Sequence, residues 1–211
     1  MKKKVCIVDY KGGNIFSVQN TLNKLGAESF LSSDPKEIEK AEKIIFPGVG
    51  SFQSAMEHIN ELGLKEVLIS KANSGIPFLG ICVGMQVLFE KGSESTGTEV
   101  EGLGIFPGTI EKFKFNDPKL KIPHMGWNQV NTPSSENPLF KGIENNSDFY
   151  FVHSYMAKKP EKDEAYLASL SNYGYDFISS IWNRENLFAC QFHPEKSAEN
   201  GLKVIQNFLS L

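Results

Sequence analysis

The run Gly80-Ile-Cys82-Val-Gly84 combines a thiol with the glycine spacing of a sharp strand-to-helix turn. An apolar stretch, Ile76–Ile81, leads into it, and a segment that we expect to be helical, Met85–Phe89, follows it. Glycines on both sides of the central residue avoid clashes in such a turn. The turn also places the thiol at a helix N-terminus, where the thiolate is favoured. Cys82 is therefore a candidate nucleophile; the alternative is a buried cysteine that packs as a small apolar residue.

A second run with catalytic potential is Gln191-Phe-His193-Pro-Glu195, at the end of an apolar strand. A thiol nucleophile needs a base, and the base needs a group that orients it. A carboxylate two residues after His193 can reach the far nitrogen of the imidazole and fix its tautomer. The alternative is a surface turn with a lone histidine and a solvated Glu195. A metal site at Cys190 and His193 lacks a second ligand pair at metal spacing, so we expect no metal.

The loop Pro47-Gly-Val-Gly50 is expected to end one strand and open a helix, which leaves its backbone N–H groups free. Attack on a carbonyl needs N–H donors aimed at the developing oxyanion. We expect Gly48, Val49 or Gly50 to supply one donor and Val83, just after the thiol, to supply the other. The alternative is an ordinary glycine-rich turn, since the spacing does not match a phosphate-binding loop.

The first half of the chain alternates apolar runs with amphipathic segments. Helical spacing follows Asn14, a short helix opens at Pro35, and a longer helical region, broken at Gly63, covers residues 51–73. This alternation predicts a parallel sheet with helices on both faces. The predicted strands of this half are Val5–Val8, Ala27–Leu31, Lys43–Phe46 and Ile76–Ile81.

The second half is richer in short strands, which we expect to be antiparallel or mixed. A closing helix follows Ser197, a plausible N-cap. Without a repeat or a linker, the pattern predicts one α/β domain over residues 1–211 with a central, mostly parallel or mixed sheet flanked by helices. The predicted strands here are Thr109–Phe115, Trp127–Asn131, Asp148–Met156, Ala165–Leu170, Phe177–Trp182 and Asn186–Phe192.

The composition narrows the class of protein. The chain of 211 residues has 22 basic and 25 acidic residues, a net charge of −3 and a pI near 5.9, without the basic excess of a nucleic-acid-binding protein. No run approaches the ~18 apolar residues of a membrane helix, and the apolar stretch Val5–Val8 is too short for a signal peptide. Because the three cysteines are few and odd in number, we expect a reduced, cytoplasmic protein in which Cys6 and Cys190 are core residues.

Longer stretches around the two candidate runs resemble a known family. Gly80-Ile-Cys82-Val-Gly84-Met-Gln86 together with His193-Pro-Glu195-Lys-Ser197 is similar to the class I, triad-type glutamine amidotransferases, which have a flavodoxin-like fold. Within that family the chain resembles the glutaminase subunits of imidazole glycerol phosphate synthases, which act in histidine biosynthesis. The stretches that carry this second resemblance are Asp9-Tyr10, Gly13-Asn14, Pro47–Phe52, Pro123–Asn128 and Phe149–Tyr155.

The resemblance implies a glutaminase reaction that needs no cofactor. The thiolate of Cys82 attacks the side-chain amide of glutamine, His193 protonates the leaving nitrogen and later activates water, and Glu195 orients His193. The groups that the resemblance assigns to glutamine binding are Gln86 and the backbone of Ser154 and Tyr155.

The resemblance also implies a partner, a (β/α)8 cyclase bound as a 1:1 heterodimer that receives the ammonia through a sheltered channel. Lys11 and the lysine-rich segment Lys112–Lys121 depart from that branch of the family. They leave open a similar subunit that feeds a sugar-aminating enzyme for surface glycans. Two further alternatives are a partner-independent cysteine hydrolase of the same fold and a binding module with an inactive elbow. The residues expected at the partner interface or the channel are Asn14, Tyr150, His153 and Lys196.

Overall fold

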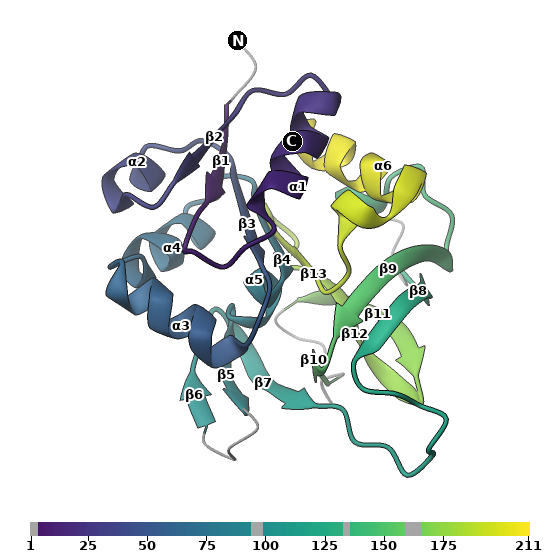
Figure 1. Ribbon diagram of the computed structural model, residues 1–211. Helices are drawn as coiled ribbons and strands as arrows, with labels where there is room; N and C mark the ends of the chain where they lie inside the picture. The colour runs from purple at the N-terminus through teal and green to yellow at the C-terminus, as the bar shows by residue number, and fades with distance from the viewer. Residues whose placement is uncertain (1–3, 94–98, 133–135, 159–165) are drawn as a thin grey trace.

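A seven-stranded mixed sheet forms the centre of the computed structural model, which describes residues 4–93, 99–132, 136–158 and 166–211 (Figure 1). Five neighbouring strands pair in parallel, and the two strands at one edge join them by antiparallel pairing, as the sequence predicted for a mixed sheet. From that edge to the other, the strands are β11 (Leu167–Tyr173), β12 (Tyr175–Trp182), β13 (Leu187–Cys190), β4 (Phe78–Cys82), β3 (Ile44–Gly48), β1 (Val5–Val8) and β2 (Ser29–Ser32).

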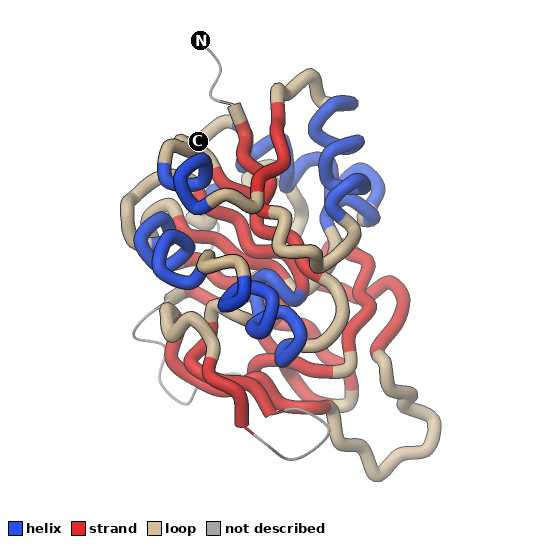
Figure 2. The backbone as a smooth tube through the Cα atoms, turned by 60° about the vertical axis from the view of Figure 1, so that its left-hand side comes forward, coloured by secondary structure: helices blue, strands red, loops and turns tan. Residues whose placement is uncertain are grey.

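The parallel part of the sheet has the doubly wound order β2-β1-β3-β4-β13. Strands β1, β3, β4 and β13 are buried along their whole length, because helices cover both faces. Helices α1 and α6 lie on one side of the sheet, and α2, α3 and α4 on the other (Figures 1 and 2). These helices are α1 (Ile15–Lys24), α2 (Pro35–Glu39), α3 (Phe52–Glu61), α4 (Lys65–Ala72) and α6 (Ala198–Leu209). None of the helices in the described ranges is long and apolar enough to cross a membrane.

Two smaller sheets lie beside the central one. A four-stranded sheet has the order β10 (Tyr155–Ala157), β7 (Phe106–Lys112), β5 (Phe89–Ser93) and β6 (Glu99–Glu101). An antiparallel pair consists of β8 (His124–Val130) and β9 (Ser147–His153). The remaining elements are one-turn helices, namely α5 (Val83–Gln86), η1 (Pro138–Phe140) and η2 (Pro194–Lys196).

Several predicted strands differ from the structure by a few residues at their ends, and two predicted elements differ more. The helix expected over Met85–Phe89 ends at Gln86, and Phe89 begins strand β5 instead. There it pairs with β7 and packs its ring against Phe106, 6.0 Å away between centroids, so tertiary pairing overrides the local helical spacing. The strand expected over Asp148–Met156 breaks after His153 into β9 and β10, which belong to different sheets.

Ser197 occupies the N-cap position of helix α6, as predicted, but it does not cap the helix through its side chain. Its hydroxyl makes no cap hydrogen bond to helix α6. Instead it donates to the carbonyl oxygen of His193 at 2.6 Å and accepts the N–H of Tyr150 at 2.9 Å.

The strand expected over Ala165–Leu170 begins at Leu167, and Ala165 lies outside the described residues.

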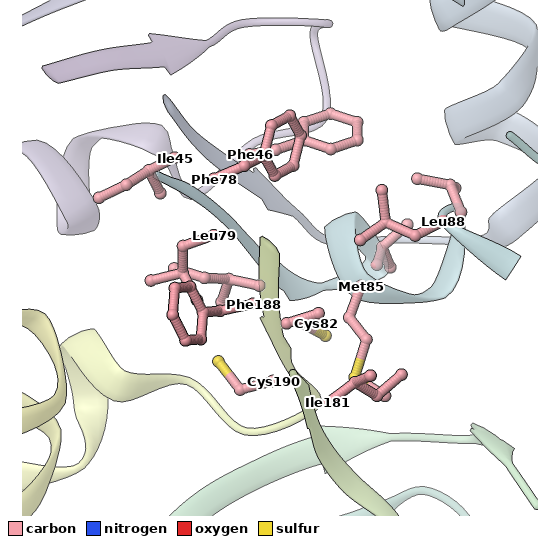
Figure 3. Close-up of a cluster of buried hydrophobic side chains, with 14 of the residues drawn as sticks. Ile45, Phe46, Phe78, Leu79, Cys82, Met85, Leu88, Ile181, Phe188 and Cys190 are labelled. Carbon is pink, nitrogen blue, oxygen red and sulfur yellow. The ribbon is translucent and has the colours of Figure 1, made fainter. Parts of the chain in front are cut away.

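The turn between β4 and α5 depends on close backbone contacts at two glycines. A Cβ atom on Gly84 would lie 1.9 Å from the carbonyl oxygen of Phe46 in β3, and one on Gly80 would lie 2.8 Å from the carbonyl oxygen of Gly84. Both distances are shorter than real carbon–oxygen contacts, so a side chain fits at neither position. Buried apolar side chains surround this turn, among them Leu79, Met85 and Phe188 (Figure 3).

We predict that Gly84→Ala lowers the free energy of unfolding by about 3 kcal/mol or more, because its methyl group meets backbone that cannot move aside. Urea unfolding of the purified chain measures the loss. The control is Gly26→Ala, where φ is +69° and no atom lies within 4 Å, so that only backbone strain of about 1–2 kcal/mol is expected. Equal losses in the two variants would contradict the steric explanation.

Candidate active site

Cys82 lies at the sharp turn where β4 ends and α5 begins. Its backbone has φ 55° and ψ −111°, a conformation that is strained for a residue with a side chain. The residue is 4% exposed and lines a cavity of about 420 Å³. Val83, the first residue of α5, has no acceptor for its N–H within the helix. The predicted elbow is therefore present, with the thiol at the cavity wall.

His193 lines the same cavity and forms a buried ion pair with Glu195. The Nδ1 atom of His193 lies 2.7 Å from Oε1 of Glu195, and the two side chains are 1% and 0% exposed. The N–H of His193 donates to the carbonyl oxygen of Tyr150 at 2.9 Å, which fixes the backbone of the histidine against β9. Among the described residues, Nε2 of His193 has no hydrogen-bond partner within normal distance. His193 and Cys82 both line the cavity, so the predicted base and nucleophile are brought together.

The surroundings of His193 favour its protonated form. Burial alone would lower the pKa of His193, but the charge of Cys82 and the interactions with Cys82 and Glu195 outweigh it and raise the pKa to about 10. A protonated imidazole beside a thiol stabilises the thiolate. The site is therefore suited to a thiolate–imidazolium pair, which is the state that nucleophilic attack requires.

Asn14 contacts the carboxylate of this pair. We expected it at a partner interface or channel, but its side-chain amide donates to Oε1 of Glu195 at 2.6 Å. It precedes helix α1 with φ 59° and makes no side-chain cap bond to that helix. The contact joins α1 to η2 and leaves Glu195 with two donors on a single oxygen, His193 and Asn14.

Gln191 is a polar group beside the thiol that the sequence analysis did not single out. Its side chain is buried, and Nε2 lies 3.6 Å from the sulfur of Cys82. Its Oε1 accepts a hydrogen bond from Nε2 of Gln86 at 2.9 Å. The alternation of side chains along an extended strand was the available signal, since Gln191 is two residues before His193.

Gln86, expected to bind substrate, is 3% exposed and lines the cavity. Besides Gln191, its Nε2 donates to the carbonyl oxygen of Tyr155 at 3.0 Å. The amide nitrogen is thus engaged within the protein. Ser154 and Tyr155, expected to offer their backbone to substrate, line the same cavity.

The expected oxyanion donors are only partly in position. Gly48 pairs with Cys82 across β3 and β4, and Val49, Gly50 and Val83 line the cavity. The N–H of Val49, however, donates to the carbonyl oxygen of Gly12 at 3.2 Å. The N–H of Val49 is therefore turned away from a substrate carbonyl. The N–H of Val83, which has no acceptor within helix α5, is the donor that is available.

The other residues expected at a partner interface differ in exposure. Lys196 is exposed on η2, and Tyr150 is half-buried with its ring 6.1 Å from that of Trp127. His153 is only 6% exposed, because it points inward and contacts the imidazole of His124.

Cys6 and Cys190 are core residues, as predicted. Both are fully buried. Burial raises the pKa of Cys6 to about 12 and that of Cys190 well above its usual range. In the described part of the chain, no three His, Cys, Asp or Glu side chains gather where they could hold a metal ion.

Comparison with known proteins decides which family this geometry represents. The model of the family described as "Glutamine amidotransferase class-I" matches residues 6–211. The chain belongs to the class-I glutamine amidotransferases. The resemblance stated from the sequence is thereby confirmed.

Curated relatives within this family match along nearly their whole length. The "Imidazole glycerol phosphate synthase subunit HisH 1" of Campylobacter jejuni is 46% identical and is covered over 100% of its length by 98% of this chain. The subunit HisH of Lactococcus lactis is 45% identical, with 98% of each chain covered. These relatives carry the name of the synthase subunit that the sequence resembles.

Two solved structures share the fold of this chain. PurLQS from Thermotoga maritima matches with a TM-score of 0.73 at 21% identity, over 100% of this chain and 99% of that one. A structure described as a glutamine amidotransferase matches with a TM-score of 0.70 at 17% identity, over 98% and 97%. At these identities the likeness concerns the α/β architecture alone.

We predict that the class-I domain loses stability as the pH falls from 6.5 to 5.5. Burial lowers the pKa of His124 to about 4 and that of His153 to about 3, against 6.5 in an unfolded chain. Below pH 6.5 the unfolded chain therefore binds protons that the folded chain does not, at a cost of up to about 1.4 kcal/mol per pH unit for each histidine. Urea unfolding at several pH values measures the slope, and His124→Asn should make it shallower; an unchanged slope would contradict the assignment.

Proposed function

We propose that this chain is the glutaminase subunit of an imidazole glycerol phosphate synthase. It hydrolyses glutamine to glutamate and ammonia, and it passes the ammonia to a cyclase subunit that makes imidazole glycerol phosphate in histidine biosynthesis. The observation that carries the proposal is that Cys82 and His193 line one cavity, with Glu195 bonded to His193, in a chain that is 46% identical to a HisH subunit over 98% of its length.

The first half of the reaction makes a thioester. The thiolate of Cys82 attacks the side-chain carbonyl carbon of glutamine, and the carbonyl oxygen becomes an oxyanion. The N–H of Val83 donates to this oxyanion. The protonated Nε2 of His193 gives its proton to the amide nitrogen, the carbon–nitrogen bond breaks, and ammonia leaves.

The second half restores the enzyme. Neutral His193 removes a proton from water as the water oxygen attacks the thioester carbon. The carbon–sulfur bond then breaks, glutamate leaves, and the thiolate of Cys82 faces protonated His193 again. Glu195 keeps the imidazole in orientation and stabilises its charge, and the amide of Asn14 holds the Glu195 carboxylate in place.

The binding of glutamine uses groups around the same cavity. Gln86 and the backbone of Ser154 and Tyr155 line it beside Cys82 and are proposed to hold the α-amino and carboxylate groups of glutamine. The volume of about 420 Å³ is sufficient for a small amino acid.

The apolar residues around the cavity are suited to a protein partner. Val49 lines the cavity, and Met125 pairs with Val152, which also lines it. Exposed apolar side chains gathered around a site are typical of an interaction surface. The exposed large apolar residues of the described chain are Phe16, Val49, Ile122, Met125 and Trp127.

The chemistry of ammonia, the product, explains why a partner subunit is needed. Water at neutral pH protonates most free ammonia and removes its nucleophilicity, so a docked cyclase with a sheltered path conserves it. We propose a 1:1 heterodimer in which Tyr150 and Lys196 face the cyclase. Asn14 and His153 lie beneath that surface, next to the route of the ammonia.

We predict that the chain restores growth without histidine to a strain that lacks only its glutaminase subunit and expresses the cognate cyclase. Cys82→Ala and His193→Ala should fail at low ammonium and succeed at high ammonium, because the cyclase then uses external ammonia. Glu195→Gln should be milder, since Glu195 orients the base and makes no bond to substrate. Cys6→Ala is the control, a buried thiol outside the cavity, and should support growth.

Two outcomes of this experiment would overturn different parts of the proposal. Growth of the Cys82→Ala strain at low ammonium would refute the triad. The wild-type chain could instead fail to restore growth and, in a pull-down against both partners, stably capture a sugar-aminating synthase. That result would replace the cyclase by the sugar-aminating enzyme as the partner and would not affect the proposed glutaminase chemistry.

We predict that the isolated chain hydrolyses glutamine slowly and that the cyclase with its bound acceptor raises kcat by about 10²-fold or more. The N–H of Val49 is bonded to Gly12, so one oxyanion donor is missing until the Gly48–Val49 peptide rotates, and a single donor supplies about that factor. Steady-state glutaminase assays with and without the partner measure the ratio. Full activity of the isolated chain would refute the idea.

A further inference from the structure

Two buried histidines face each other across the β8–β9 pair; His153 lines the glutamine pocket, and His124 lies on the side of His153 away from Tyr155. His124 and His153 occupy directly paired positions and are 3% and 6% exposed. Nδ1 of His124 lies 3.0 Å from Nε2 of His153, and Nδ1 of His153 lies 2.7 Å from the carbonyl oxygen of Tyr155. At the other end, the side-chain amide nitrogen of Asn128 lies 3.3 Å from Nε2 of His124. The four groups form one continuous chain.

The groups at the two ends determine the direction of donation along this chain of hydrogen bonds. The carbonyl oxygen of Tyr155 can only accept, so Nδ1 of His153 carries the proton and donates. Nε2 of neutral His153 then accepts, which requires the proton of His124 to lie on Nδ1. Nε2 of His124 therefore accepts from Asn128, whose amide nitrogen also donates to the carbonyl oxygen of Asn172 at 2.9 Å. Both imidazoles are thus in the Nδ1–H tautomer.

Aromatic rings enclose the pair and keep it neutral. The ring of His124 stacks between those of Tyr173, 4.1 Å away, and Phe151, 5.1 Å away. His153 contacts Phe113 at 5.2 Å and Phe177 at 5.1 Å between centroids. Such surroundings penalise a charged imidazole, and the lowered pKa of each histidine agrees with this.

The chain ends on the backbone that lines the pocket. The carbonyl oxygen of Tyr155 accepts from His153 and also from Nε2 of Gln86 at 3.0 Å, so both of its lone pairs are used. The carbonyl oxygen of Ser154 accepts the N–H of Phe113 at 3.0 Å. Both peptide groups that follow Ser154 and Tyr155 are therefore held by their carbonyl oxygens, at the corner between β9 and β10.

We infer that His124 and His153 are positioning residues for glutamine binding: as a one-directional chain of neutral imidazoles from Asn128 to Tyr155, they fix the Ser154–Tyr155 backbone in the pocket. The inference rests on the proposed glutaminase function for its substrate, and on the hydrogen-bond geometry for the chain itself. Neither histidine takes part in bond making, because His193 and Cys82 do that.

A matched pair of substitutions at His153 distinguishes the effect of losing the hydrogen-bond donor from the effect of changing the side-chain volume. His153→Asn keeps a side-chain N–H where Nδ1 stands, whereas His153→Leu has nearly the same shape without a donor. In the complex with the cyclase, His153→Leu should raise KM for glutamine about 10-fold, the effect of one lost hydrogen bond, and change kcat much less. His153→Asn should restore KM to within about threefold of the wild type. Equal KM values for the two variants, or a loss confined to kcat, would overturn the inference.

A second measurement tests the chain without any assay of activity. Nitrogen-15 NMR of the imidazoles in the full-length wild-type protein should find both His124 and His153 in the Nδ1–H tautomer at neutral pH. An Nε2–H tautomer or a charged ring at either position would refute the chain. A wild-type complex that hydrolyses no glutamine, with both tautomers as expected, would instead refute the proposed function and leave the hydrogen-bond chain intact.

Discussion

The approach of Gly84 to the carbonyl oxygen of Phe46 is the contact on which the site depends. It brings the start of α5 against β3, so that the chain must reverse sharply at Cys82 and accept a strained backbone there. The sulfur is consequently held at the carboxyl end of β4, beside the end of β3. In doubly wound sheets, ligands bind outside the carboxyl ends of the strands.

The base joins Cys82 at the cavity from a different part of the chain, and three contacts hold it there. β9 accepts the N–H of His193 through Tyr150, and the hydroxyl of Ser197 donates to the carbonyl oxygen of His193. Asn14, at the start of α1, donates to Glu195. The imidazole therefore has little freedom to rotate away, which matches the preorganisation that proton transfer to a leaving group requires.

The local parts of this arrangement could be predicted from the sequence, and the distant contacts could not. Glycine spacing and an apolar strand are local signals, and they placed Cys82 at an elbow. The contact between Asn14 and Glu195 joins positions 181 residues apart and arises only when α1 packs beside η2. The position of Gln191 could have been predicted, because side chains two residues apart in an extended segment point the same way, and Gln191 stands two residues before His193. His153 was expected near the partner surface but is buried, since the pairing of β8 with β9 sets it against a second histidine that no spacing rule connects to it.

Side chains alternate between the two faces of strand β8, and the two faces have different roles. His124 and Asn128 point inward to the hydrogen-bond chain that includes His153, while Met125 and Trp127 are 63% and 54% exposed on the opposite face. Substitutions on the outer face can therefore change the shape offered to another protein without moving the groups on the inner face. After a gene duplication, such a strand would let a copy of the subunit acquire a new synthase while its preference for glutamine is inherited unchanged.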